Sequence, residues 1–363
     1  MKHILTIATL ALTLSCFSLS VNTAKAQTST STYQPGVTQE GATYFLPKTA
    51  IRIAVTVEKT VYTPGDFAPY AERFLRLNNV STQPSTTYRI VSVKQTAIGV
   101  RDTSKAYSVK FNNKTSAINL ALADDGVILA VNAQPVPLIL PTPFQPAQKP
   151  ATVNPRQFMN EEILAAGSTA KMAQLTAQEI YDLRDSRSQL IKGQADFMPK
   201  DGEQLKMMLS QIDRQDQALT SLFAGTTVRD TTEELFIVRP GEELQKLPLF
   251  RFSKRFGLVD ADDLSGTPFY INIQNLTQLP ASDAEQGAKK KKAENGLYYN
   301  VAGKMQATIL DGNTVVSKDE FPAAQFGYVE LLSGDLFNKH YATKLWLNPV
   351  SGGIDRIEAE QPK

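Results

Sequence analysis

Strict alternation between apolar and polar side chains is the feature that most constrains how this chain folds. Ile51, Ile53, Val55 and Val57 occupy every second position, which is the pattern of a strand with one buried face. The alternation returns after residue 225 in several short runs separated by Gly, Pro and Asp. Short strands punctuated in this way favour antiparallel sheets, in a sandwich or a barrel-like arrangement.

Between these β-rich parts the apolar spacing becomes helical. Thr176 and Glu179 have the spacing of a capping box, which predicts a helix that begins at Ala177. Gly193 is placed to end that helix, and Asp201 is placed as the N-cap of a second one. Two helices joined by so short a segment make an antiparallel hairpin.

A shorter helix is predicted near the N-terminal strands. Phe67, Tyr70, Phe74 and Leu77 recur at helical spacing, with charged residues between them. We expect this helix to lie on the sheet through its apolar face.

The chain therefore has the pattern of an α+β protein, with antiparallel β-rich N- and C-terminal parts and an intervening helical hairpin. Its Pro-rich segment is either a free extended linker or an extended stretch packed over a sheet, because Pro denies the chain ladder hydrogen bonds. The expected divisions are a signal peptide at 1–26, a flexible leader at 27–44, an N-terminal β-rich domain at 45–134, a Pro-rich linker at 135–156, a helical hairpin region at 157–225 and a C-terminal β-rich domain at 226–363.

The N-terminus has the pattern of a secretory signal peptide. An apolar run over residues 4–21 leads to small residues that end at Ala26, so a signal peptidase would cut between Ala26 and Gln27. A transmembrane anchor needs about 20 apolar residues, whereas this run contains several Thr and Ser. A loose lipobox ends at Cys16, and lipidation of Cys16 would anchor the chain to the outer membrane instead of leaving it periplasmic or secreted. We expect no transmembrane span after the signal is removed.

Charge argues against nucleic acid as a partner. The chain has 38 Lys and Arg against 36 Asp and Glu, and the predicted signal contains two of the Lys but no acidic residue. The mature chain is therefore neutral, and it has no general positive field with which to gather phosphates.

Cysteine and histidine are nearly absent, which excludes several kinds of site. Cys16 is the single Cys, and His340 is the one His after the signal. Structural zinc takes four Cys or His ligands and catalytic zinc usually takes at least two His, so we expect no metal and no cofactor. A carboxylate-dependent hydrolase needs neither residue type, and it remains the alternative to a protein without catalytic activity.

Two charged residues stand out because they fall within the apolar stripes of the expected hairpin. Arg187 lies in the middle of the first stripe and Asp216 in the second. A hairpin folded about residues 196 and 197 places Arg187 opposite Lys206, roughly 15 Å along the axis from Asp216, so the two should not pair with each other. Arg187 and Asp216 are the candidate ligand-binding residues, and structural ion pairs with other residues are the alternative.

Three stretches resemble a family of secreted Bacteroidetes proteins that is described as a domain of unknown function. The stretches are "TYFLPKTAIRIAVTVEKTVYTPGDFAPYAERFL", "LRDSRSQLIKGQADFMPKDGEQLKMML" and "AAQFGYVELL". The resemblance covers nearly the whole mature chain and implies an envelope location in gut-type anaerobes. It implies no activity, ligand or catalytic residue.

Two short motifs remain. In a Bacteroidetes periplasm, the run from Asp230 to Thr232 fits a glycosylation signal and makes Thr231 a candidate glycan acceptor. Lys289 to Lys292 form either a contact for anionic glycan or lipid, or a solvated loop.

Together these features predict an exported cell-envelope protein. Its expected role is non-enzymatic binding or scaffolding, and its expected partner is an envelope protein or glycan. The pattern leaves the oligomeric state open.

Overall fold

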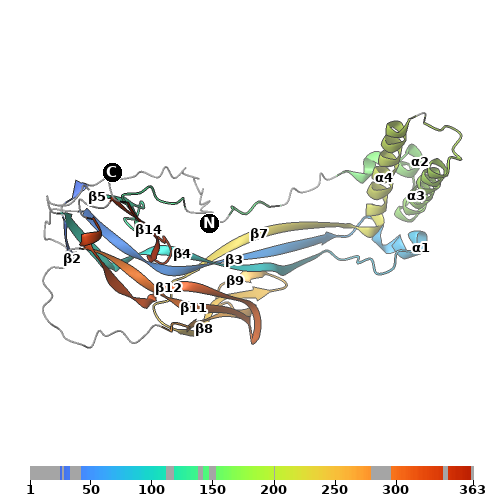
Figure 1. Ribbon diagram of the computed structural model, residues 1–363. Coiled ribbons are helices and arrows are strands. Elements are labelled where there is room, and N and C mark those ends of the chain that lie inside the picture. The colour runs from blue at the N-terminus through green and yellow to red at the C-terminus, as the bar shows by residue number, and fades with distance from the viewer. Residues whose placement is uncertain are drawn as a thin grey trace, which may run out of the picture.

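The computed structural model describes residues 25–26, 28–32, 42–111, 118–137, 142–146, 153–199, 201–278, 296–337 and 342–360. These residues form three antiparallel sheets and a group of helices. The sheets lie at one end of an elongated molecule and the helices at the other (Figure 1). The expected α+β class, with antiparallel β-rich parts and a helical hairpin, is confirmed.

The first sheet contains the longest strands and connects the two ends of the molecule. Its order is β2-β4-β3-β7. The bounds are β2 Thr28–Thr32, β3 Ala42–Thr63, β4 Ser85–Phe111 and β7 Thr226–Val238. β3 pairs with β4 on one side and with β7 on the other. The chain therefore leaves this sheet to build the helices and returns to it as β7.

The other two sheets cover this one and complete the part that we call the β body. The second sheet has the order β12-β11-β10-β8-β9, and the third has the order β1-β5-β6-β13-β14. The bounds are β8 Leu244–Ser253, β9 Gly257–Val259, β10 Thr267–Asn275, β11 Gly296–Asp311 and β12 Thr314–Ser333 in the second sheet, and β1 Lys25–Ala26, β5 Ile118–Leu122, β6 Ile128–Val131, β13 Ala342–Leu347 and β14 Ile354–Glu360 in the third. A 3-10 turn, η4, spans Gly334–Phe337.

Strand pairing crosses the divisions expected from the sequence. Strands from 45–134 and from 226–363 share both the first and the third sheets. Residues 28–32, within the expected flexible leader, form β2 and pair with β4. In the expected Pro-rich linker, residues 142–146 form no helix or strand.

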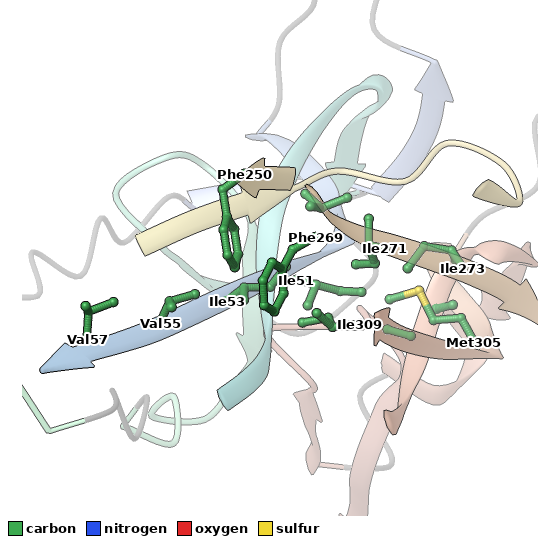
Figure 2. Close-up of a cluster of buried hydrophobic side chains, with 13 residues drawn as sticks. Ile51, Ile53, Val55, Val57, Phe250, Phe269, Ile271, Ile273, Met305 and Ile309 are labelled. Carbon is green, nitrogen blue, oxygen red and sulfur yellow. The ribbon is translucent and has the colours of Figure 1, made fainter. Parts of the chain in front are cut away.

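The alternating residues of β3 build the main core of the β body. Ile51, Ile53, Val55 and Val57 are buried, and they face apolar side chains of the second sheet (Figure 2). The facing residues include Phe250, Phe269, Ile271, Ile273, Met305 and Ile309. Period-two spacing therefore places one face of β3 in the core, as the sequence predicts.

A second core lies at the opposite end of β3 and joins the first sheet to the third. It contains Tyr44 and Leu46 from β3, Leu120 from β5 and Leu345 from β13, all fully buried. The Tyr44 hydroxyl donates to the Tyr298 carbonyl at 3.2 Å and accepts from the Tyr298 N–H at 2.8 Å. Apolar packing therefore joins the third sheet to the first, and the buried Tyr44 hydroxyl joins β3 to β11 of the second sheet.

A polar network is also buried in the β body. Asn300 is fully buried, and its Nδ2 donates to the carbonyl oxygens of Pro47 at 2.8 Å and of Ser351 at 2.9 Å. Its Oδ1 accepts from Lys105 Nζ at 3.1 Å. Burial lowers the pKa of Lys105, while Asp102 acts in the opposite direction. This one amide satisfies polar groups from three separate segments.

The helices form a second body, which we call the helical head. The bounds are η1 Ala68–Tyr70, α1 Ala71–Leu75, η2 Pro155–Phe158, α2 Glu161–Leu164, α3 Thr169–Lys192 and α4 Gly202–Ala224. Within the described ranges, none of the helices combines the length and apolar character that crossing a bilayer takes.

The two long helices confirm two of the three expected ends. Gly193 ends α3 with a φ of 69°, and the Asp201 side chain accepts from the Gln204 N–H at the start of α4. The expected start at Ala177 is wrong, because α3 begins two turns earlier behind Ser168. Thr176 does not cap a helix; its hydroxyl donates to the Met172 carbonyl one turn back, as Thr can do inside a helix.

The short helix α1 lies in a different place from the one that the sequence predicts. Ala71 and Leu75 of α1, and Phe67 just before η1, pack with residues of α3 and α4, not on the sheet. Phe67 and Phe223 contact each other with ring centroids 5.3 Å apart. The apolar spacing indicates a helix, but it does not indicate whether that helix packs on the sheet or on other helices.

Candidate functional site

The helical head is attached to the first sheet through close backbone contacts. The Phe67 N–H donates to the Leu222 carbonyl at 2.7 Å, and the Tyr62 hydroxyl donates to the carbonyls of Ser81 and Ala224. A Cβ on Gly65 would lie 2.1 Å from the Leu222 carbonyl oxygen, which only Gly tolerates. The contacts at this junction hold the head in a defined orientation at the end of β3, β4 and β7 (Figure 1).

The part of the head next to the junction has a complete apolar core. Ile180 from α3 and Leu219 and Phe223 from α4 are fully buried there, with α1 and α2 packed around them. This core takes buried side chains from α4 only at Leu219 and beyond. The head is therefore well packed at its base.

The far part of the hairpin, residues 184–192 of α3 and 202–217 of α4, is packed differently. We call it the distal hairpin. Leu205 and Leu209 are only half-buried, and Met207 is 72% exposed. Ile191 and Phe197, at the same end, are also exposed. Exposed apolar side chains thus occur on α4, on α3 and on the segment between them.

A groove of about 600 Å³ runs along the distal hairpin, and we call it the α4 groove. Its lining comes from α4 apart from one α3 residue, Arg187. The lining residues are Arg187, Gly202, Leu205, Lys206, Leu209, Ser210, Asp213, Arg214 and Gln217. The groove therefore combines two Leu side chains with three cations and one carboxylate.

Both charged residues that the sequence selects have partners in the hairpin. Arg187 Nε donates to Asp213 Oδ1 at 2.6 Å, and this hydrogen bond raises the pKa of Arg187. Asp216 accepts from Arg184 Nε at 3.1 Å and from the Thr220 hydroxyl. As expected, Arg187 and Asp216 do not pair with each other. Structural ion pairs thus account for both charges, and ligand binding by either one stays a prediction.

The hairpin register differs from the expected one. In the pairs Arg187–Asp213 and Arg184–Asp216, the residues lie opposite each other about a midpoint near residue 200. The hairpin therefore turns about three residues later in the chain than the expected midpoint at 196 and 197. By this register, residue 192 at the end of α3 lies opposite residue 208, so the first turns of α4 reach beyond α3. This shift leaves Leu205 and Met207 without a facing residue on α3.

The groove residues of α4 were missed in the sequence, although a signal exists. Positions 202, 205, 209, 213 and 217 repeat at spacings of three and four, which is one helical stripe. The sequence places Leu205 and Leu209 in the same stripe as the buried Leu219. This one stripe is buried in the core at Leu219 and Phe223, and at Leu205 and Leu209 it lines the groove.

The remaining predicted residues lie elsewhere. Thr231 is a half-buried residue of β7 and pairs with Glu58 of β3. Ala26 is in β1, where it pairs with Ile118, while Cys16 and Gln27 lie outside the described residues. So does the run from Lys289 to Lys292. Thr231 and Ala26 are not among the residues that line the α4 groove.

Two hollows of the β body are alternatives to the α4 groove. One of about 900 Å³ is lined by polar and apolar residues near the end of β10, where the Thr277 hydroxyl accepts from the Lys304 N–H at 3.0 Å. Another of about 390 Å³ contains the carboxylates of Glu234, Asp260 and Asp263. A hydrogen bond from the Ser265 N–H lowers the pKa of Asp263. In the described ranges, no group of three or more His, Cys, Asp or Glu side chains could hold a metal ion.

Comparison with protein families matches residues 40–355 to the family described as Domain of unknown function (DUF4831). The chain belongs to this family. The match spans the β body and the helical head together, so both are parts of one family domain. Neither curated proteins nor solved structures contain a match to the chain.

Proposed function

We propose that this DUF4831 protein is exported to the cell envelope and acts there by binding a partner, with the helical head as the binding element. The signal-like residues 4–21 followed by Ala26 support export. The resemblance to secreted Bacteroidetes proteins supports the same compartment. The partner is an envelope protein or glycan.

The position of the head is the observation that carries this proposal. The junction holds the head at the end of the long strands, and its distal hairpin presents exposed Met207, Phe197 and Ile191. Beside them, Leu205 and Leu209 line the α4 groove, and ligand or partner sites are often grooves that combine apolar side chains with a few charged ones. A binding role requires such a surface, and it requires no arrangement of catalytic groups.

Export is tested by expressing the full chain in a bacterial host and fractionating the cells. We expect the chain in the envelope fraction, with a mature mass that begins at Gln27. A mass that begins at lipidated Cys16 would instead indicate anchoring to the outer membrane. A variant with Ala24→Arg and Ala26→Arg serves as the uncleaved control. A full-length chain in the cytoplasm would contradict export.

Binding by the head is tested with a photo-crosslinking residue placed at Met207 and, as a matched control, at Val316 on the β body. Both positions are exposed and apolar. In native envelope preparations we expect a discrete adduct from position 207 that is absent from position 316. Adducts from position 316 alone would move the binding element to the β body.

The second candidate function is a carboxylate-dependent hydrolase that acts on glycan or peptide. The hollow with Glu234, Asp260 and Asp263 favours it, because glycoside hydrolysis uses a pair of carboxyl groups. The lowered pKa of Asp263 suits a base or a nucleophile and not an acid. Hydrolysis of envelope glycan that is lost in Glu234→Gln and in Asp260→Asn would support this function over binding.

A further inference from the structure

The distal hairpin is a two-helix structure that has room for a third helix. At the base of the head, η1, α1 and η2 contact α4. The buried core formed there ends at Leu219 on α4 and includes none of residues 202–217. Two helices alone leave part of each apolar stripe open, and Leu205 and Leu209 lie in that open part.

The shape of the α4 groove fits a helix. It follows α4 from Gly202 to Gln217, which is about 24 Å at 1.5 Å per residue. Leu205 and Leu209 lie one turn apart in the floor of the groove, so they offer a row into which side chains of a neighbouring helix can pack. A helix of about four turns would cover the groove, and amphipathic helices bind apolar grooves of this kind through residues spaced three and four apart.

The charge of the groove selects the polar residues of that helix. Arg187 is neutralised by Asp213, whereas Lys206 and Arg214 are exposed and have no ion-pair partner among the residues that the structure describes. Asp213 is the carboxylate among the lining residues, so the groove has an excess of positive charge. Acidic side chains on a bound helix would match Lys206 and Arg214.

We propose that the α4 groove binds an amphipathic helix of a partner protein, with an apolar stripe on Leu205 and Leu209 and acidic residues beside Lys206 and Arg214. The bound helix completes a three-helix arrangement in the distal hairpin. This inference rests on the proposed binding function of the head and adds the chemistry of the partner.

The test uses a displayed library of 16-residue helical peptides in which the apolar stripe is constant and the flanking positions are Glu, Lys or Gln. The full mature chain is the bait. We expect enrichment of Glu at the flanks, and about tenfold or greater loss of affinity for the enriched peptide in the double variant Lys206→Glu with Arg214→Glu. The same variant should enrich Lys in place of Glu.

Two further variants separate the groove from the rest of the surface. Leu205→Glu should abolish binding of the enriched peptide, and circular dichroism checks that the head keeps its helices. Lys171→Glu changes a charge near the start of α3, outside the groove lining, and should leave binding unchanged. Raised salt should weaken binding to the parent chain, because the contacts to Lys206 and Arg214 are exposed.

Several outcomes would overturn the inference. Enrichment of Lys or of neutral flanks, or enrichment that the groove variants do not change, would exclude an acidic helix. A dimer in sedimentation that Leu205→Glu dissociates would assign the groove to a second copy of the chain. Binding to vesicles of anionic lipid that Lys206→Glu abolishes would assign it to a membrane surface. None of these outcomes depends on where the chain is exported, so they are distinct from a failure of the export experiment.

Discussion

The β body and the helical head both place polar groups among apolar ones, and they satisfy these groups in different ways. In the body, the amide of Asn300 is buried and binds Pro47, Ser351 and Lys105. In the head, Arg187 pairs with Asp213 while both side chains remain about two-fifths exposed. Breaking a buried network leaves polar groups without water or a partner, whereas exposed ion pairs contribute little to stability. The polar groups of the body hold the fold, and the charges of the head remain accessible to a partner.

The contrast also exists within the head, between its base and the distal hairpin. Leu219→Ala at the base should lower the free energy of unfolding by about 2–5 kcal/mol, because it opens a cavity in a closed core. Leu209→Ala in the groove should lower it by less than Leu219→Ala does, by about 1–2 kcal/mol, since its side chain is only partly buried and leaves no closed cavity. Urea unfolding followed by far-ultraviolet circular dichroism measures both. Equal losses would mean that the distal hairpin is as well packed as the base.

The buried network of the body should respond almost as strongly. Asn300→Ala leaves the carbonyls of Pro47 and Ser351 and the Lys105 amine without their partner, at an expected cost of about 2–4 kcal/mol. Asn313→Ala, in the exposed loop between β11 and β12, is the matched control and should change stability by less than about 0.5 kcal/mol. Fluorescence of Trp346, the single Trp, reports unfolding of the body. If Asn300→Ala left the stability unchanged, the polar groups of the body would contribute no more to the fold than those of the head.

The junction is where body and head can be uncoupled. Gly65→Ala puts a methyl group against the Leu222 carbonyl, so the backbone has to move, and we expect a loss of about 1–3 kcal/mol. Gly241→Ala meets no atom within 4 Å and serves as the control. Hydrogen exchange of α1 and α4 amides should speed up in Gly65→Ala and stay unchanged in Gly241→Ala. Unchanged exchange in both would mean that the head does not depend on this contact.

The smallest expected effect concerns a polar pair at the edge of the body. Burial first, and then the hydrogen bond to Glu330 at 2.6 Å, raise the pKa of Tyr299 to about 12. The unfolded phenol ionises near pH 10, so the contribution of Tyr299 to stability is present below pH 10 and is lost between about pH 10 and 12. Burial also raises the pKa of Tyr44 and of Tyr107, so phenolate absorbance should show several late-titrating Tyr residues, one fewer of them in Tyr299→Phe. In Glu330→Gln the pKa of Tyr299 should fall but stay above the usual value. Ionisation of Tyr299 near pH 10 in the parent chain would contradict the assignment.

Local patterns in the sequence predict the local structure well, and they predict long-range contacts poorly. The alternation at Ile51 to Val57 gives both the strand and its buried face, because side-chain direction depends only on the neighbouring residues. The pairing of β3 with β7 places Ile51 opposite Val238, and no local pattern in either strand identifies the other as its pairing partner. The capping-box prediction at Thr176 failed for a related reason, since the same hydroxyl can bond inside a helix as well as at its end.

The candidate site was predictable to a similar extent. The hairpin, its Gly193 end and its Asp201 cap follow from short-range rules. Arg187, selected from the sequence as a charge within an apolar stripe, lines the groove and pairs with Asp213. The groove depends on the register between α3 and α4: Arg187 lies opposite Asp213 and not opposite Lys206, which is a shift of seven residues along α4. Short-range rules for the ends of the two helices do not give this register.

The contact between Phe67 and Leu222 also bears on the order in which the chain folds. β3 ends at Thr63 and β7 begins only at Thr226, so a long stretch of chain separates the two strands that pair. Such distant pairings slow folding, because the closure of a long loop precedes any gain from the contacts. The head brings Thr63 and Thr226 together, and the ladder can then grow residue by residue toward Val238. We expect Leu219→Ala to slow refolding of the body, with the head acting as the nucleus that starts β7.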